Sequence, residues 1–219
     1  YLHLAGQQAV QRSAYAEALS HLTKGLVLLK TLPDTPGRAQ QELALQIALG
    51  APLQATKGWG APEVERVYAR ARELCQQVGE TPQLFPVLWG LWLFHTTRGE
   101  LQTARELGEQ LLSLARSVQD PALLLQAHHA LWTTSFYFGE VASTREHAEQ
   151  GMALYKTQPP CPRALQRGAD AGVGCLSYLS RVLWILGYPS HALQSIQAAL
   201  TLAQAVSHPF STAFALSNA

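Results

Sequence analysis

Arg98-Gly99-Glu100-Leu101-Gln102-Thr103-Ala104 opens a helical segment that ends near Leu114, and this stretch decides the fold because the chain repeats it. With Gly99 as the anchor, equivalent anchors recur every 40 to 48 residues at Ser13, Trp59, Gly139 and Gly187. Five residues after each anchor stands a short side chain: Ala18, Val64, Ala104, Thr144 and Ala192. Twelve residues after it the side chain is mostly small: Gly25, Ala71, Leu111, Gly151 and Ala199. Fifteen residues after it stands a leucine in every copy: Leu28, Leu74, Leu114, Leu154 and Leu202. A period in this range is typical of proteins built from stacked helix pairs.

Hydrophobic residues follow helical spacing along almost the whole chain, and strand signals are nearly absent. The sequence predicts one all-α domain over residues 1–219, a right-handed solenoid of antiparallel helix pairs. We expect the pairs over 1–31, 38–79, 82–118, 121–157 and 170–206, followed by a truncated helix over 209–219. Thr81-Pro82 and Asp120-Pro121 predict capped helix starts. Pro52 predicts a kink or an early helix end near Gly50, and the prolines of 157–168 predict a long linker.

Composition excludes several classes of function. The net charge is +1 with no long basic run, so there is no electrostatic case for binding nucleic acid. The three cysteines lack metal-ligand spacing and suit a reducing, cytoplasmic compartment. The longest apolar run, Leu84–Phe94, is too short to cross a membrane, which needs about 20 residues. We expect no cofactor and no metal.

The helix pairs resemble the tetratricopeptide repeat (TPR). Leu91, Leu131 and Leu179 match the leucine of the first helix in that family, and Ser180 matches its small residue. Trp132, like Trp92 and Pro52, departs from the small residue, and the 40-residue period exceeds the usual length of roughly 34. The resemblance implies a TPR-like fold with longer helices.

A closer resemblance covers nearly the whole chain. Four segments are similar to the C-terminal repeat region of large bacterial multidomain signalling ATPases, which carry cyclase, kinase or transcriptional-activator modules: residues 57–64 (KGWGAPEV), 98–101 (RGEL), 130–132 (ALW) and 183–189 (LWILGYP). Asp170-Ala171-Gly172-Val173 is similar to a D-P-G-V segment of that region, with Ala171 in place of proline. This resemblance implies a regulatory arm that binds a partner or senses an effector. It implies no catalytic residue in this chain.

Sequence motifs for catalysis or ion binding are weak. The chain has no G-x-x-x-x-G-K-[ST] segment, which excludes a P-loop. The glycine-rich segment 168–174 precedes a helix and could hold an anion, although it follows no strand. His128 and His129 are adjacent, so on a helix they point about 100° apart and cannot share a metal ion as an i, i+4 pair can.

The candidate binding residues come from the first helices of the third to fifth pairs, which line the concave side of a TPR superhelix. By this mapping the groove candidates are Trp89, Thr96, Gln126, His129, Thr133, Phe136, Tyr137, Ser177, Arg181 and Trp184. Trp92 and Trp132 occupy identical repeat positions and are expected in the core. Core packing is also an open alternative for the groove aromatics. Trp89, Phe136 and Trp184 are expected to be partly exposed along one concavity.

The sequence favours non-catalytic recognition of a protein segment or of a neighbouring domain in the parent chain. The alternative is a small-molecule effector held between the groove aromatics and Arg181. An α-helical enzyme is disfavoured because no nucleophile–base or metal constellation is present. The ends carry apolar residues without a polar cap, which predicts self-association through them: Leu2, Leu4 and Val10, and Phe210, Phe214 and Leu216.

Overall fold

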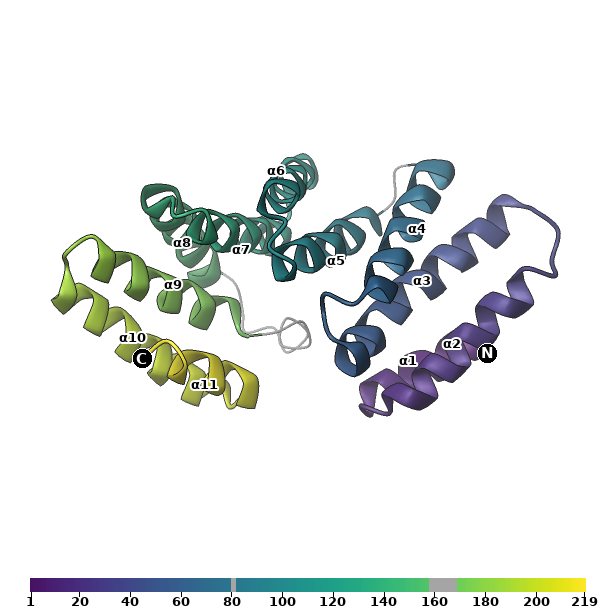
Figure 1. The fold of residues 1–219 in the computed structure, drawn as a ribbon, viewed down its shortest axis with the longest axis horizontal. Helices are drawn as coiled ribbons and strands as arrows, with labels where there is room; N and C mark the ends of the chain where they lie inside the picture. The colour runs from purple at the N-terminus through teal and green to yellow at the C-terminus, as the bar shows by residue number, and fades with distance from the viewer. Residues whose placement is uncertain (80–81, 158–168) are drawn as a thin grey trace. The chain divides into compact units, whose positions relative to one another are not determined.

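The structure, a computed structural model, describes residues 1–79, 82–157 and 169–219, and within these ranges it contains helices and no strand (Figure 1). The helices are α1 Leu2–Gln11, α2 Tyr15–Leu29, α3 Pro36–Lys57, α4 Pro62–Val78, α5 Leu84–Thr97, α6 Leu101–Val118, α7 Pro121–Tyr137, α8 Val141–Lys156, α9 Ala171–Ile185, α10 Pro189–Val206 and α11 Pro209–Leu216. Of these, none combines the length and the apolar character that a membrane crossing requires. The chain divides into two compact units, Tyr1–Leu107 and Gly108–Ala219, with the boundary inside α6.

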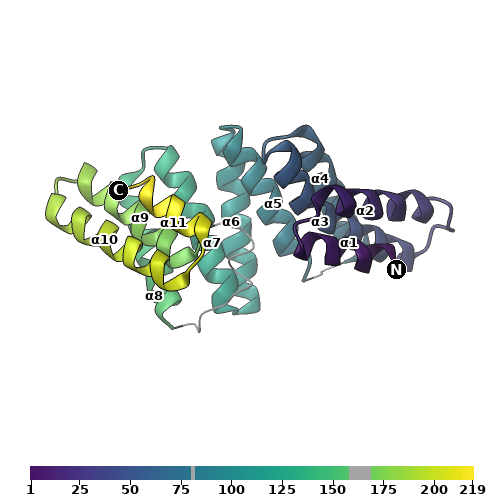
Figure 2. The same cartoon turned by 90° about the horizontal axis from the view of Figure 1, so that it is seen from below.

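Unit 1 (Tyr1–Leu107) is built from the hairpins α1–α2 and α3–α4, followed by α5. Each helix packs on the next, and the odd-numbered helices α1, α3 and α5 also contact one another in sequence (Figure 2). The ring of Tyr68 on α4 occupies the space where Gly50 on α3 and Gly90 on α5 would carry a Cβ. The two glycines therefore let three helices approach around one aromatic side chain.

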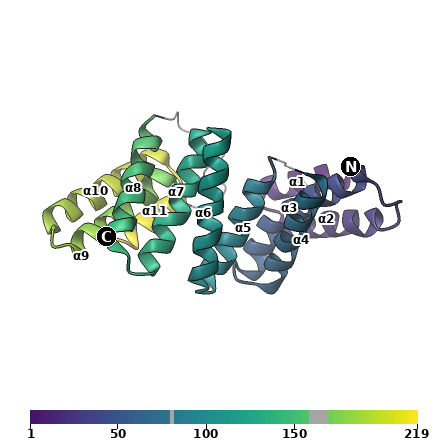
Figure 3. The same cartoon turned by 90° about the horizontal axis from the view of Figure 1, so that it is seen from above.

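Unit 2 (Gly108–Ala219) repeats this arrangement with the hairpins α7–α8 and α9–α10 (Figure 3). Helix α11 packs on both α9 and α10 (Figure 2). Trp132 on α7 is fully buried, and it belongs to a core cluster with Leu125, Ala148, Cys175, Tyr178 and Leu179. Its ring lies against Gly151 on α8, where a Cβ would collide with it. Trp92, at the same repeat position in unit 1, is also buried. The expectation of core packing for both tryptophans is confirmed.

Four of the five anchors lie in the left-handed region of backbone space. Ser13, Gly99, Gly139 and Gly187 have φ between 58° and 82°. In each of these turns the amide after the anchor donates to the carbonyl five residues earlier, as Glu100 N–H does to His95 O at 2.9 Å. This is the hydrogen bond of the Schellman motif, which ends a helix and turns the chain back. At Trp59 the positive φ instead belongs to the preceding residue, Gly58.

The repeat positions divide into core and surface. The residues five and twelve after the anchors are buried in all five copies. The leucine fifteen after the anchor is less uniform, because Leu74 is fully buried whereas Leu28 is 58% exposed. The short side chains therefore mark the helix contacts more reliably than the invariant leucine does.

Most helix bounds lie within two residues of those expected, although α11 ends at Leu216 rather than near 219. Three further differences concern α3 and α5. α3 begins at Pro36, because the Thr35 side chain accepts a hydrogen bond from the Arg38 amide at 3.2 Å. It then continues through Pro52 to Lys57, so of the two expected outcomes, a kink or an early end near Gly50, the early end is wrong. Burial of Leu49, Gly50, Pro52 and Leu53 against neighbouring helices outweighs the missing amide of Pro52.

The third difference is at α5, which begins at Leu84 rather than Pro82, with Gln83 as a cap that makes no side-chain hydrogen bond. Asp120, in contrast, caps α7 as expected and accepts from the amide of Ala122 at 2.8 Å. Most of the expected linker, residues 158–168, lies outside the described residues, as does Thr81.

Candidate functional site

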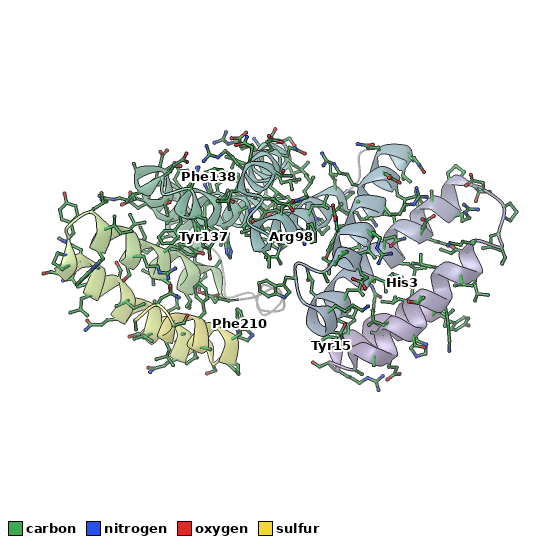
Figure 4. The ribbon with its side chains drawn as sticks, viewed as in Figure 1. His3, Tyr15, Arg98, Tyr137, Phe138 and Phe210 are labelled. Atoms are coloured by element: carbon green, nitrogen blue, oxygen red, sulfur yellow. The ribbon has the colours of Figure 1, made fainter. Side chains whose placement is uncertain are left out.

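The ends of α7 and α9 in unit 2 present apolar side chains immediately before the turn glycines. These are the residues three, two and one positions before Gly139 and before Gly187. Phe136 is half-buried, and the other five are exposed; Tyr137 and Phe138 are labelled in Figure 4. We call this set the apolar strip: Phe136, Tyr137, Phe138, Trp184, Ile185 and Leu186.

A cavity of about 430 Å³ adjoins the apolar strip. Phe136 comes from α7, the wall of α9 includes Arg181 and Trp184, and α10 contributes aliphatic side chains. The full lining is Phe136, Ser180, Arg181, Trp184, Ile185, Ala192, Leu193, Ile196, Asn218 and Ala219. It contains no acidic side chain. A single cation therefore stands in a mostly apolar wall.

Aromatic contacts fix the position of Arg181. Its guanidinium carbon lies 5.1 Å from the centroid of the Phe136 ring, within the range of a cation–π contact. Phe136 in turn packs edge-on against Tyr178, with ring centroids 5.2 Å apart. Tyr178 is buried, and burial raises the pKa of its hydroxyl. The phenol is therefore neutral, so its ring supports Phe136 without placing a negative charge near Arg181.

Arg181 has no carboxylate partner among the described residues. The sequence explains this, because residues 171–219 contain no Asp, Glu or Lys and no second Arg. Arg145, on α8, is instead paired with Glu149 at 2.7 Å in the same unit. Arg181 is thus an exposed guanidinium that is oriented by an aromatic ring and available to an acidic ligand.

The other groove candidates fall into different environments. Thr133 and Ser177 are buried, and Gln126 and His129 are partly buried. The His129 ring stacks on Trp132 with a centroid distance of 4.7 Å, and burial lowers its pKa to about 4. Of the candidates in unit 2, Phe136, Arg181 and Trp184 line the cavity, and Tyr137 follows Phe136 directly in the chain.

Two groove candidates belong to unit 1. Trp89 is only 9% exposed and packs on Trp92 at a centroid distance of 4.7 Å. The partial exposure expected of Trp89 is therefore wrong, because its ring fills space beside the core tryptophan. Thr96 is partly buried near the end of α5.

In the structure His128 contacts His147, whereas the sequence drew attention to His128 and its neighbour His129. Nδ1 of His128 on α7 lies 3.1 Å from Nδ1 of His147 on α8. Burial, and then the neighbouring His147, lower the pKa of His128 to about 4, so the pair is neutral at pH 7. Within residues 1–79, 82–157 and 169–219, no group of three or more His, Cys, Asp or Glu side chains is placed to hold a metal ion.

The glycine-rich entry to α9 and the cysteines also have structural explanations. The carboxylate of Asp170 accepts the amide of Val173 at 3.1 Å, so a side chain of the chain itself already occupies this helix start. Cys75 and Cys175 are both buried, and Cys161 lies outside the described residues. Burial raises the pKa of Cys175 well above its usual value, which keeps it protonated.

Sequence reasoning missed part of the apolar strip and of the cavity wall. It did not single out Phe138, Leu186, Leu193 or Ile196 as candidates. For Phe138 and Leu186 a usable signal was present, since aligning the five copies on their anchors places both one residue before a turn glycine. For Leu193 and Ile196 no signal was available, because an outer-helix aliphatic residue normally faces the core.

Comparison with known sequences finds a much longer relative. No protein-family model matches the chain. An uncharacterized protein of Rhizobium meliloti (strain 1021) is 26% identical over 215 residues, which cover 97% of this chain and 21% of that protein. The chain therefore spans about a fifth of the length of this relative.

Solved structures settle the fold class. Two crystal structures of a Podosopora anserina protein described as kinesin light chain with nearly identical TPR-like repeats, one of them of a substituted form, superpose with TM-scores of 0.68 and 0.66. Their sequence identity to this chain is 19% and 20%, over 94% and 93% of its length and 94% of theirs. The chain has a TPR-like helical repeat fold. This fold generally serves protein–protein interaction and is typically non-catalytic.

Proposed function

We propose that this chain is a non-catalytic interaction module that binds a protein segment through the apolar strip and the adjoining cavity of unit 2. The observation that supports this most directly is the exposure of the strip, in which Trp184 is 68% exposed beside Ile185 and Leu186. Contiguous exposed apolar residues of this kind mark interaction surfaces. Tryptophan and arginine are the residues that most often dominate the energy of such surfaces.

The shape of the site favours a chain segment over a small molecule. A small-molecule site encloses 70–90% of its ligand, whereas the walls of this cavity include a tryptophan that is two-thirds exposed. Side chains presented by an extended or helical segment could enter the cavity while the segment backbone lies along the strip.

The biological setting that we propose is a regulatory arm of a bacterial, cytoplasmic signalling protein. It rests on the resemblance to the repeat region of multidomain signalling ATPases and on the much longer Rhizobium meliloti relative. A neighbouring domain of such a protein is then a second possible owner of the bound segment. Self-association through the apolar chain ends remains a proposal of the same kind, supported by the exposure of Leu4, Phe210 and Leu216.

A peptide-display selection tests the interaction directly. A random twelve-residue library is selected on the immobilised 219-residue chain, and bound peptides are compared on a variant with Tyr137→Thr, Trp184→Thr and Ile185→Thr. We expect selected peptides to lose at least about tenfold in affinity on this variant, because hot-spot truncations cost about 2 kcal/mol or more. A matched control substitutes Leu28→Thr and Val27→Thr, exposed residues of α2 outside the strip. Selected peptides that bind both variants equally would contradict the proposal.

The second candidate function is effector sensing, which the cavity volume and the oriented Arg181 favour. The volume of about 430 Å³ lies within the 300–1,000 Å³ range of small-molecule pockets. A thermal-shift screen of aromatic and aliphatic carboxylates decides this. A ligand at one hundred times its dissociation constant adds about 2.7 kcal/mol to stability, and the shift should disappear in Arg181→Gln. Shifts that persist in that variant would place the ligand elsewhere.

A further inference from the structure

We infer that the ligand of the unit 2 site is a segment of a separate protein that carries an acidic residue beside a large apolar residue. This inference rests on the proposed function and adds the chemistry of the partner. The apolar residue enters the cavity between α9 and α10, and the carboxylate binds the guanidinium of Arg181.

The first argument for this ligand is charge complementarity. Arg181 is the only permanently charged side chain among residues 171–219, and no described carboxylate side chain lies within ion-pair distance of it. Elsewhere in the described chain, several arginines meet acidic partners, as Arg98 meets Glu100 at 3.0 Å and Arg70 meets Glu42 at 2.7 Å. A guanidinium without a partner in an apolar wall selects a ligand that brings a carboxylate.

The orientation of Arg181 makes it a better carboxylate receptor than an ordinary surface arginine. Its contact with the Phe136 ring restricts the side chain before any ligand arrives. Less side-chain entropy is then lost on binding, and the planar guanidinium can form two parallel hydrogen bonds to one carboxylate. Phe136 is itself held by the buried ring of Tyr178.

The spacing within α9 sets where the apolar residue of the ligand must lie. Trp184 and Ile185 follow Arg181 by three and four residues, so all three share one helix face. Leu193 and Ile196 of α10 contribute aliphatic side chains to the wall of the same cavity. A carboxylate on Arg181 therefore places the neighbouring ligand side chain over Trp184 and into the aliphatic part of the cavity.

The test measures carboxylate preference in trans. Peptides obtained by selection from a random twelve-residue library are synthesised with each Asp or Glu retained or replaced by Asn or Gln, and their affinity is measured by fluorescence anisotropy. For the unchanged chain we expect the acidic peptide to bind about 5- to 20-fold more tightly than its amide counterpart at low salt, with the ratio decreasing as salt screens the pair. In Arg181→Gln the ratio should fall to about 1, and Arg181→Lys should retain part of it.

Two controls separate this inference from the proposed function. Arg145→Gln removes an arginine of the same unit that is already paired with Glu149, and it should leave the ratio unchanged. Trp184→Ala should weaken the acidic and the amide peptide alike. Peptides that depend on Trp184 but show the same affinity with and without the acid overturn the carboxylate inference and leave the proposed function standing. Peptides indifferent to Trp184 overturn both.

Other occupants of the site give distinct results. Concentration-dependent dimers in light scattering that Trp184→Ala abolishes would show a second copy of this chain on the site, and would overturn the assignment to a separate protein. Binding of N-acetyl-tryptophan as tight as that of the acidic peptide would show that a small carboxylate suffices, and would overturn the assignment to a protein segment. Weak binding of this probe together with tight peptide binding supports the inference.

Discussion

The two units differ in the chemistry of the residues that precede the turn anchors. In unit 1 the three residues before the anchors are mostly polar: Val10, Gln11 and Arg12; Thr56, Lys57 and Gly58; Thr96, Thr97 and Arg98. Each of these turns carries an ion pair, Arg12–Glu17, Lys57–Glu63 and Arg98–Glu100. In unit 2 the equivalent residues form the apolar strip.

This difference distinguishes the backbone features of the turn, which the fold requires, from the side chains before the anchor, which it does not constrain. The left-handed anchor and its backbone hydrogen bond are the same at Gly99 in unit 1 as at Gly139 and Gly187 in unit 2. Exposed ion pairs contribute little to stability, with a typical value of about 0–1 kcal/mol. The turn therefore tolerates either polar or apolar side chains, so folding does not require the apolar strip, and this fits the binding role that we propose for it.

The largest effect is expected in the cores, where the two units should behave alike. Trp92→Ala and Trp132→Ala each remove a fully buried indole, and each should lower the free energy of unfolding by about 3–5 kcal/mol. Urea unfolding of each variant measures this. Trp184→Ala is the matched control, because its ring is 68% exposed and should cost about 1 kcal/mol or less. Equal losses at Trp132 and Trp184 would contradict the division into core and binding surface.

The burial of Trp92 and Trp132 at equivalent repeat positions shows how much of the fold could be predicted from the sequence. Repeat period, helix positions and both core tryptophans follow from spacing, because stacked pairs must bury the same positions in each copy. The continuation of α3 through Pro52 could not be predicted, since it depends on burial against other helices. The same limit applies to the site: spacing placed Phe136, Arg181 and Trp184 on one side of their helices, but it could not distinguish them from the buried Trp89, whose exposure depends on tertiary neighbours.

The second prediction concerns the pH dependence of the free energy of unfolding. The buried histidines of unit 2 should make this unit more sensitive to acid. The folded-state pKa of His128 is lowered to about 4 from 6.5, and that of His147 is also lowered, chiefly by burial. The unfolded chain therefore binds more protons between these pH values, so this contribution to stability is present above pH 6.5 and is lost as the pH falls toward 4. We expect unit 2 to lose about 1–3 kcal/mol over this range from His128.

Urea unfolding at pH 7 and pH 4.5 measures the pH effect, and His128→Gln should reduce it. The control is His191→Gln, on the exposed side of α10. Carboxylates titrate in the same pH range in every variant. The informative quantity is therefore the difference in pH-dependent stability loss between His128→Gln and His191→Gln. An identical pH dependence in both would show that the His128–His147 contact does not control the acid sensitivity of unit 2.

The third prediction tests the contact between Gly90 and the ring of Tyr68 in unit 1. Gly90→Ala places a methyl group where the ring of Tyr68 lies, and overpacking of this kind costs about 1–3 kcal/mol. Gly174→Ala in α9 of unit 2 is the matched helical control, because its nearest neighbour, the Trp132 ring, would lie at an ordinary 3.8 Å. That change should be neutral or stabilising by up to about 1 kcal/mol through helix propensity. Thermal unfolding of the pair measures the contrast, and Tyr68→Leu should relieve part of the cost in the Gly90→Ala background.

The smallest stability effect is expected from exchanging the turn residues themselves. Tyr137→Thr with Phe138→Arg gives the α7–α8 turn the residues that unit 1 has at Thr97 and Arg98. Both side chains are exposed, so the double variant should change the free energy of unfolding by about 1 kcal/mol or less, while it weakens binding of strip-dependent peptides. The reciprocal change, Thr97→Tyr with Arg98→Phe, removes the exposed Arg98–Glu100 pair and should be equally mild. It creates an apolar turn without Arg181, so it should bind apolar peptides without preference for an acid. A loss above about 2 kcal/mol for the first exchange would mean that the strip belongs to the core of unit 2, because only buried side chains cost that much.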